Sequence, residues 1–244
     1  MLPVPPRFLL RLARKCQRLD AIPRKSKDFP LDLPPSCRLE DLSALDGQPS
    51  FADIRMAWNP RGVGLQVTVS GKKQPAAGDV KRPAVADGVT LWLDTRDSHG
   101  SHRGTRFCHQ FHFLASGGGP DGEDPCIVQA KIHRALQDAP MAQVTELPFH
   151  CAIFPDGYHL EVFLTESALH GFSTEECPRL RTCLRVHDRE QGDMILDCTA
   201  ELPYGEDPSL WSVLILDAGE GKPKGKKSAR PSFKGEKENH RDAN

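Results

Sequence analysis

A hydroxyl, an indole and a carboxylate lie at every second position of the segment Asp87-Gly-Val-Thr-Leu-Trp-Leu-Asp94. Side chains on a β-strand point alternately to its two faces, so Thr90, Trp92 and Asp94 share one face and the apolar residues share the other. An indole beside hydrogen-bonding groups on an open sheet suits a flat, hydroxyl-rich ligand such as a sugar. We therefore predict that Trp92 is an exposed platform for a saccharide; the alternative is that a loop or the N-terminal segment covers it.

A second group of residues could bind a metal ion. Residues 94–112 concentrate carboxylate, imidazole and thiol groups, which are ligands of zinc and other transition metals, although their spacing matches no standard ligand set. The candidates in or beside a predicted loop are Asp94, Asp97, His99 and His102. His112 is a further candidate. His109 shares a strand face with three phenylalanines, so we expect it to be a hydrogen-bonded core residue.

Asp87 and Asp94 stand at the two ends of one predicted strand. Their oxygens could bind calcium, a hard cation that prefers carboxylate and carbonyl ligands. The simpler role is to accept hydrogen bonds from the amides of the adjoining turns. The sequence therefore requires no cofactor, and it leaves calcium or a transition metal as an open alternative.

The sequence carries no motif of a familiar catalytic type. A glycosidase needs two carboxylates placed about 5–10 Å apart across the bound sugar, and nothing singles out a pair such as Asp94 and Glu161. There is no Gly-x-Ser-x-Gly segment and no Gly-x-x-x-x-Gly-Lys phosphate loop. We predict that the chain is not an enzyme.

These residues must be positioned by short strands, because alternating apolar residues and turn signals dominate the chain from Phe51 onward. The turn segments 59–62 and 155–157 predict two β-hairpins, and a single helical turn is expected at 165–171. One-sided alternation indicates antiparallel sheets packed face to face, so we predict an all-β, jelly-roll-like β-sandwich with minimal helix. Its eight to ten strands are expected within 51–58, 65–70, 89–94, 106–115, 127–134, 149–154, 158–165, 182–187, 194–200 and 210–216.

Composition bounds the fold and the partners. The chain has 244 residues, 38% of them hydrophobic and 27% charged, which suits one sizeable β domain. A formal net charge of −1 creates no global field that would recruit nucleic acid or a membrane surface, so we predict neither as a partner. Three regions are expected: an N-terminal arm over 1–45, the sandwich over 46–217, and a basic, disordered tail over 218–244.

The cysteines and the N-terminus favour a cytoplasmic protein. The basic segment 7–16 lacks the apolar stretch of about 7–15 residues that a secretory signal contains. The eight cysteines include no Cys-x-x-Cys pair, so a zinc-ribbon type of site is not expected. We expect reduced thiols that pack as small apolar residues.

The ordered set of strand motifs resembles the family-9 carbohydrate-binding modules, β-sandwiches within the broader DOMON-like group. The resemblance extends over 51–216, about two thirds of the chain. Its segments are Ala57-Trp58, Val63-Gly-Leu-Gln-Val-Thr-Val69, Asp87-Gly-Val-Thr-Leu-Trp-Leu-Asp94, Gln110-Phe-His-Phe113, His159-Leu-Glu-Val-Phe163, Ser167-Ala-Leu169, Leu184-Arg-Val-His-Asp188 and Asp207-Pro-Ser-Leu-Trp211.

The resemblance implies a saccharide held on a concave sheet by polar side chains and loop aromatics. The matching positions are Thr90, His112 and Arg185 on the sheet and Tyr204 in a loop. The sequence departs from the family in one respect, because residues 71–86 contain no aromatic side chain where such modules place a tryptophan. Trp92 would have to replace it.

Three functions follow as hypotheses. The first is a non-catalytic carbohydrate-binding domain, linked through its relatives to carbohydrate catabolism, whose ligand contacts Thr90, Trp92, His112, Arg185 and Tyr204. The second is a metal- or haem-binding DOMON-like sandwich. The third is a scaffold for an unknown protein partner that has lost ligand binding.

Overall fold

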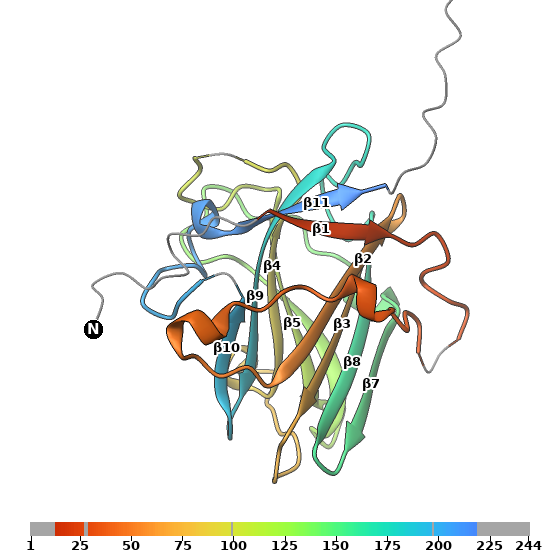
Figure 1. Cartoon of the computed structure of the whole chain (residues 1–244), viewed down its shortest axis with the longest axis vertical. Coiled ribbons are helices and arrows are strands. Elements are labelled where there is room, and N and C mark those ends of the chain that lie inside the picture. The colour runs from red at the N-terminus through yellow and green to blue at the C-terminus, as the bar shows by residue number, and fades with distance from the viewer. Residues whose placement is uncertain (1–12, 27–28, 99, 197, 219–244) are drawn as a thin grey trace, which may run out of the picture.

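The computed structural model describes residues 13–26, 29–98, 100–196 and 198–218 (Figure 1). The described part of the chain contains eleven strands, joined by turns and 3-10 turns, and all of them belong to one sheet. They are β1 (Ala13–Arg18), β2 (Ala52–Asn59), β3 (Gly62–Ser70), β4 (Gly88–Asp94), β5 (Cys108–Gly118), β6 (Asp124–Ala130), β7 (Phe149–Phe154), β8 (Gly157–Thr165), β9 (Arg179–Asp188), β10 (Gly192–Leu196) and β11 (Ser212–Asp217). The 3-10 turns are η2 (Pro35–Cys37), η3 (Ser43–Asp46), η4 (Pro83–Val85), η5 (Val144–Glu146) and η6 (Pro208–Leu210).

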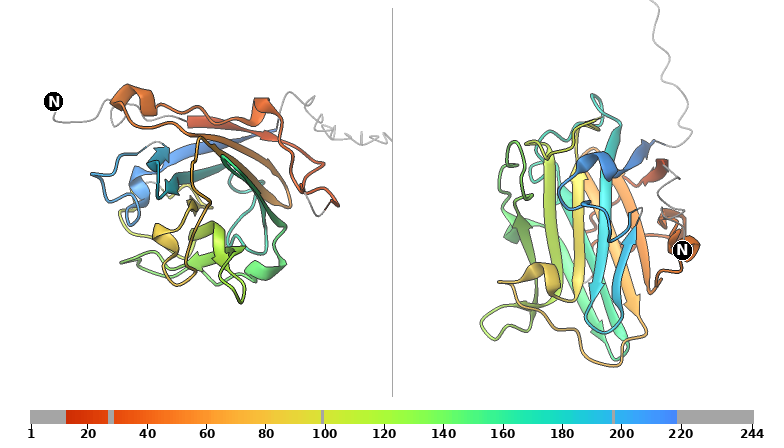
Figure 2. Two further views of the ribbon diagram at one scale, coloured as in Figure 1. Left: turned by 90° about the horizontal axis from the view of Figure 1, so that it is seen from below. Right: turned by 90° about the vertical axis from the view of Figure 1, so that its left-hand side faces the viewer.

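The sheet curls almost into a closed barrel, which corrects the prediction of a sandwich of two separate sheets. Its strand order is β6-β5-β4-β9-β11-β1-β2-β3-β8-β7, with β10 paired to β9. The connection between the two halves is β1, which pairs in parallel with both β11 and β2. Figure 2 shows the two halves facing each other, with β1 and β11 closing one side. The all-β class and the near absence of helix are confirmed.

The interior of the barrel is filled by the apolar residues that the alternation assigned to one face. Val89, Leu91 and Leu93 of β4 are at most 1% exposed, and they pack with Phe111 and Phe113 of β5. Burial of such side chains is the main source of stability, at roughly 25 cal/mol per Å² of apolar surface. The inner register of β4 was therefore predicted correctly.

Trp58 lies in this core and also joins strands that are distant in sequence. Its Nε1 atom is 3.0 Å from the carbonyl oxygen of Cys16 in β1 and 3.2 Å from that of Asp217 in β11. A buried indole N–H needs an acceptor. Here the acceptors are backbone carbonyls of β1 and β11, two neighbouring parallel strands. Trp58 therefore helps to hold these strands together where the barrel closes.

Two apolar clusters lie on the outside of the barrel, each covered by a segment of the chain. In the first, Ala57 of β2 and Phe163 of β8 pack against apolar residues of the arm, which are Leu19, Ile22, Leu31, Leu33 and Cys37. A second cluster, outside β4, β5, β9 and β10, lies beneath residues 132–135 and 198–211. Trp211 is 2% exposed in the second cluster, where its Nε1 donates to the carbonyl of Tyr204 at 2.7 Å.

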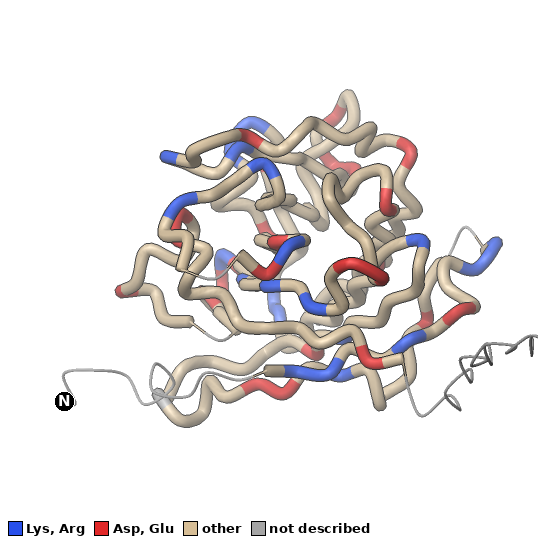
Figure 3. The backbone as a smooth tube through the Cα atoms, turned by 90° about the horizontal axis from the view of Figure 1, so that it is seen from above, with Lys and Arg blue, Asp and Glu red and all other residues tan. Residues whose placement is uncertain are grey.

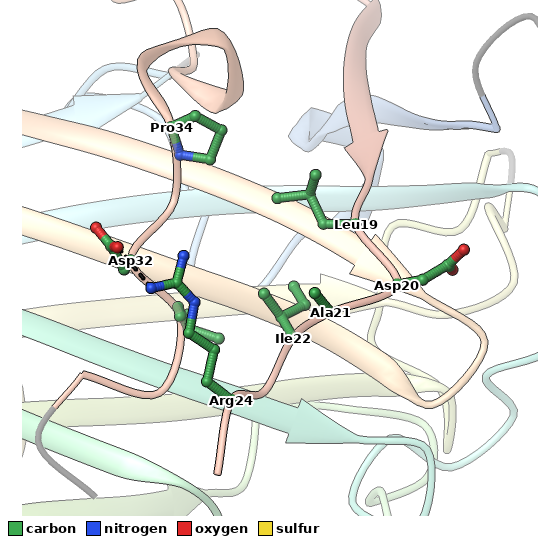
Figure 4. A pocket seen from close by; sticks show the side chains of 8 residues that line it. Leu19, Asp20, Ala21, Ile22, Arg24, Asp32 and Pro34 are labelled. Carbon is green, nitrogen blue, oxygen red and sulfur yellow. Dashed lines mark hydrogen bonds and ion pairs between the residues drawn. The ribbon is translucent and has the colours of Figure 1, made fainter. Parts of the chain in front are cut away.

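The arm is fastened by a buried carboxylate and encloses a hollow of its own. Glu161 on β8 is 1% exposed and accepts hydrogen bonds from the amides of Leu31 at 2.7 Å and Asp32 at 3.1 Å. Figure 4 shows the hollow that the arm forms here, about 470 Å³ in volume, with the Arg24–Asp32 ion pair beside it. A carboxylate that accepts two amides holds an otherwise irregular segment against the sheet.

Glu161→Gln tests this attachment. The change removes the charge that strengthens both hydrogen bonds, so we expect the free energy of unfolding to fall by about 1–3 kcal/mol. Amide hydrogen exchange at Leu31 should accelerate by a larger factor than exchange at Leu91 in the core. Glu166→Gln, at an exposed position on the same chain segment, is the matched control and should change stability by less than about 0.5 kcal/mol. Equal effects of the two variants would contradict this role of Glu161.

Positions of both charge signs are spread over the described backbone (Figure 3). The whole sequence has a formal net charge of −1. Among the described residues, no helix is both long enough and apolar enough to cross a membrane.

Candidate functional site

A buried polar row crosses the outer faces of β5, β4 and β9. Thr90 pairs in register with His112 on one side and with Arg185 on the other. The Thr90 hydroxyl is 2.9 Å from Nδ1 of His112, and Nε2 of His112 is 3.0 Å from the side-chain nitrogen of Gln110. An amide nitrogen only donates, so Nε2 accepts and the proton on Nδ1 is donated to Thr90. The structure thus brings three predicted site residues side by side, and hydrogen bonds link two of them, Thr90 and His112.

His112 is held neutral within this row. Burial is the main reason that its pKa falls to about 4, and the positive charge of Arg185 lowers it further. The ring therefore carries no charge at neutral pH, which suits a network that depends on one nitrogen accepting and the other donating.

Arg185 ties three segments of the chain together. Its guanidinium donates to the carbonyl oxygen of Ala84 in η4, and its Nε atom is 3.8 Å from a carboxylate oxygen of Asp193 on β10. It also forms a hydrogen bond with the side chain of Tyr204, whose pKa is raised by burial in spite of this cation. Arg185 therefore positions the loop at 83–85 against the sheet.

Trp92 is not the open platform that we predicted. Its side chain is only 5% exposed, and the ring of Tyr204 meets it edge-on with the ring centroids 5.4 Å apart. Around it lie Cys183 and Ile195 of the sheet and the apolar residues of the 198–211 loop. Covering this apolar cluster is favourable, whereas leaving a large indole in water is not. The alternative, in which a loop covers Trp92, is the correct one.

A hollow opens beside the Arg185 end of the polar row, between residues 78–85 and the end of β9. It has a volume of about 450 Å³, and we call it the η4–β9 hollow; its lining residues are Gly78, Asp79, Arg82, Val85, His187 and Arg189. His187 is two residues from Arg185 on β9, and its Nδ1 is 2.7 Å from Asp193. The signal that could have revealed it is the alternation of Arg185 and His187, which places both on one face of β9, followed directly by Arg189 in the turn after the strand.

The predicted metal ligands do not converge. Asp94 accepts hydrogen bonds from the amides of Arg96 at 2.9 Å and Ser98 at 2.7 Å, so it caps the turn that follows β4. Asp97 forms ion pairs with two arginines, and His102 is 3.0 Å from Asp207. His99 lies outside the described residues. Across the part of the chain that the structure describes, no three His, Cys, Asp or Glu side chains are grouped as a metal site.

His109 and Cys108, which also lie within residues 94–112, have structural roles too. His109 is buried, with Nε2 3.3 Å from the carbonyl of His170, and burial lowers its pKa to about 4, so the prediction of a core histidine is confirmed. Burial raises the pKa of the Cys108 thiol to about 11, which disfavours the thiolate that a metal needs. All eight cysteines are free in the structure.

Asp87 orders the loops around the start of β4. It accepts hydrogen bonds from the amide of Ala77 at 3.0 Å and the amide of Arg189 at 2.7 Å, and Nζ of Lys72 is 3.2 Å away. Asp94 and Glu161 lie on different halves of the barrel, where Asp94 caps a turn and Glu161 holds the arm. That arrangement does not place the pair across one bound sugar.

The fold resembles that of family-9 carbohydrate-binding modules. A module of this family from Caldicellulosiruptor kristjanssonii, solved in complex with cellotriose, superposes with a TM-score of 0.57 over 89% of this chain and 100% of its own, at 12% sequence identity. A second structure of such a module from the same organism, in complex with glucose, gives a TM-score of 0.48 at 12% identity over 71% of this chain and 80% of its own. No family model and no curated protein matches the sequence. At this identity the likeness concerns the fold.

Proposed function

We propose that this chain is a non-catalytic saccharide-binding domain whose ligand occupies the η4–β9 hollow. The observation that carries the proposal is the shared fold, which extends over the full length of a module that was solved with cellotriose. Fold alone does not assign function. The proposal therefore also rests on a polar hollow at the end of the sheet formed by β4, β5 and β9, the sheet on which the resemblance predicts a ligand.

The hollow is large enough for a small saccharide and offers suitable groups. Its volume of about 450 Å³ lies within the common range for ligand sites, about 300–1,000 Å³. The guanidinium groups of Arg82 and Arg189 donate hydrogen bonds, and the carboxylate of Asp79 accepts them. Sugar hydroxyls do both, so each ring hydroxyl can find a partner in the hollow.

The buried row supports this hollow from behind. Thr90 and His112 are at most 3% exposed, and Arg185 is held between them and η4. In this arrangement Arg185 is a positioning residue, because it holds the loop that forms one wall of the hollow. Direct contact of Thr90, His112, Arg185, Tyr204 or Trp92 with a saccharide stays a prediction from the sequence.

Arg185→Met tests the proposal by calorimetric titration with cellotriose. Loss of the guanidinium frees the carbonyl of Ala84 and the loop around it, so we expect affinity to fall by about tenfold or more. Arg179→Met is the matched control, because Arg179 lies on the same strand but pairs with Asp97 far from the hollow, and it should retain the affinity of the unmodified protein. If neither cellotriose nor any saccharide on a glycan array binds the unmodified protein, the proposal is wrong and the scaffold hypothesis gains.

We further propose a role in carbohydrate catabolism, from the family resemblance, and a cytoplasmic location, from the N-terminal sequence and the cysteines. The metal or haem alternative receives no support from the described part of the candidate ligands, since Asp97 is paired with arginines and Asp94 caps a turn.

A further inference from the structure

The η4–β9 hollow lacks the group by which proteins commonly recognise neutral sugars. None of its six lining residues is Phe, Tyr or Trp, and Trp92 of β4 is 5% exposed beneath Tyr204. The one ring in the lining is the imidazole of His187, whose Nδ1 is 2.7 Å from Asp193. A sugar ring therefore finds no Phe, Tyr or Trp face to stack on within the hollow. Specificity there must come from hydrogen bonds and charge.

The charged groups of the lining favour an anion. Two guanidinium groups, those of Arg82 and Arg189, face one carboxylate, that of Asp79. The Asp79 carboxylate already accepts the Lys81 amide at 2.9 Å and Nε of Arg82 at 3.3 Å, as the cap of its own turn. Asp79 and Arg82 therefore compensate each other's charge, and Arg189 supplies the net positive charge of the lining.

Both guanidinium groups retain free donors. Nε of Arg82 contacts Asp79, and the side chain is 75% exposed. Nε of Arg189 is 3.7 Å from Asp87, a carboxylate that Lys72 and two backbone amides already bind, and this arginine is 53% exposed. An arginine presents five N–H donors in a planar fork that fits a carboxylate or phosphate in a bidentate manner.

The remaining carboxylates around the hollow are engaged by other partners. Asp193 is 2.7 Å from Nδ1 of His187. Glu190 accepts the amides of Lys73 and Gln74 within 3.2 Å. Asp193 and Glu190 thus already accept hydrogen bonds from neighbouring residues. The N–H groups of Arg82 and Arg189 that have no partner among the described residues favour a ligand that accepts hydrogen bonds.

We infer that the η4–β9 hollow binds a saccharide that carries an anionic substituent, with Arg82 and Arg189 as the residues that select it. This inference rests on the proposed function, because it assigns the ligand class of the same site. The shared chemistry is a carboxylate, phosphate or sulfate on a sugar ring, and the arginine fork accommodates each of them.

Three sugars with the same ring test the inference on the full-length protein: glucose, glucuronate and glucose 6-phosphate, titrated by calorimetry or followed by NMR shifts. We expect the two anionic sugars to bind about tenfold or more tightly than glucose, a ratio that about 0.5 M NaCl should reduce because exposed charges are screened. The stronger of the two anionic sugars identifies carboxylate or phosphate as the preferred group. Inorganic phosphate and acetate measure how much of the affinity needs the sugar ring.

Arg82→Gln and Arg189→Gln should each bring the ratio of anionic to neutral affinity towards one. Arg179→Gln, on β9 but outside the hollow, should leave the ratio unchanged. Arg82 is largely exposed, so its replacement leaves the fold intact, which far-UV circular dichroism verifies.

The outcomes separate the two proposals. If glucose or cellotriose binds as well as the anionic sugars, or if neither arginine variant alters the ratio, the anionic ligand class is wrong while saccharide binding stands. If no sugar of any kind binds, both proposals fall. Equal affinity for inorganic phosphate and glucose 6-phosphate would show an anion site without saccharide recognition, which also overturns the inference.

Discussion

Lys72→Met should lower the free energy of unfolding by about 3–5 kcal/mol, the cost of leaving a buried ion pair without one partner. The ammonium of Lys72 lies between Asp87, at 3.2 Å, and Asp188, with which it is in direct contact. All three side chains are at most 2% exposed. Methionine fills the same space without the charge, so two buried carboxylates would be left close together with no cation between them.

The neighbourhood of Asp188 shows why the cation matters. Burial is the largest single influence on the pKa of Asp188 and raises it, but hydrogen bonds from Lys72 and from the amides of Gln191 and Glu190 together outweigh burial, so the pKa is lowered. The Tyr158 hydroxyl is buried nearby, and its pKa is raised by burial and then by the charges of Asp188 and Asp87. Removal of the ammonium leaves all of these groups in an uncompensated negative field.

Lys15→Met is the matched control, because it removes a lysine that is paired on the surface. Lys15 is 79% exposed and 3.7 Å from Asp217, so its loss should change stability by less than about 1 kcal/mol. Urea unfolding at neutral pH measures both variants. If Lys72→Met lowers the free energy of unfolding no more than Lys15→Met does, the buried ion pairs of Lys72 with Asp87 and Asp188 do not stabilise the fold as we expect.

Acid should destabilise the protein through two buried histidines. Burial is the main cause that lowers the pKa of His109 and of His112 to about 4. In the unfolded chain a histidine takes up its proton near pH 6.5, so between about pH 6.5 and 4 the unfolded state binds more protons than the folded state. The contribution of each neutral histidine to the free energy of unfolding is therefore fully present above about pH 6.5. It is lost as the pH falls to about 4, and the loss is about 3 kcal/mol for each histidine.

His112→Gln measures the part of this pH dependence that His112 contributes. Glutamine does not titrate, so the difference in unfolding free energy between about pH 7 and pH 4.5 should be about 2–3 kcal/mol smaller than in the unmodified protein. His133→Gln changes a histidine that is 76% exposed and should retain the full pH dependence. The measurement is a set of urea unfolding curves at several pH values. An unchanged pH dependence in His112→Gln would show that the ring is not held neutral.

Local rules were sufficient for the strands from β2 onward and for the direction of their side chains, but not for β1, which lies in the segment 1–45 that was expected to be an N-terminal arm. Alternation with period two identified Val89, Leu91 and Leu93 as core residues, and the turn at 155–157 indicated the β7–β8 hairpin, because both depend on neighbours in sequence. The same rule put Thr90 on the outer face of β4, and the family resemblance supplied His112 and Arg185, which pair in register with Thr90. The sequence thus determined which chemical groups form the row.

Only the tertiary structure decided what lies over that row and how the sheet closes. Trp92 is covered by Tyr204, more than one hundred residues later in the chain, and β1 enters between β11 and β2 by parallel pairing. Alternation shows which way a side chain points, but it carries no information about which distant segment packs on it. Coverage depends instead on how well loops far apart in sequence bury one another's apolar surface. That is why the groups of the row could be predicted from the sequence, while the burial of Trp92 and the position and lining of the hollow could not.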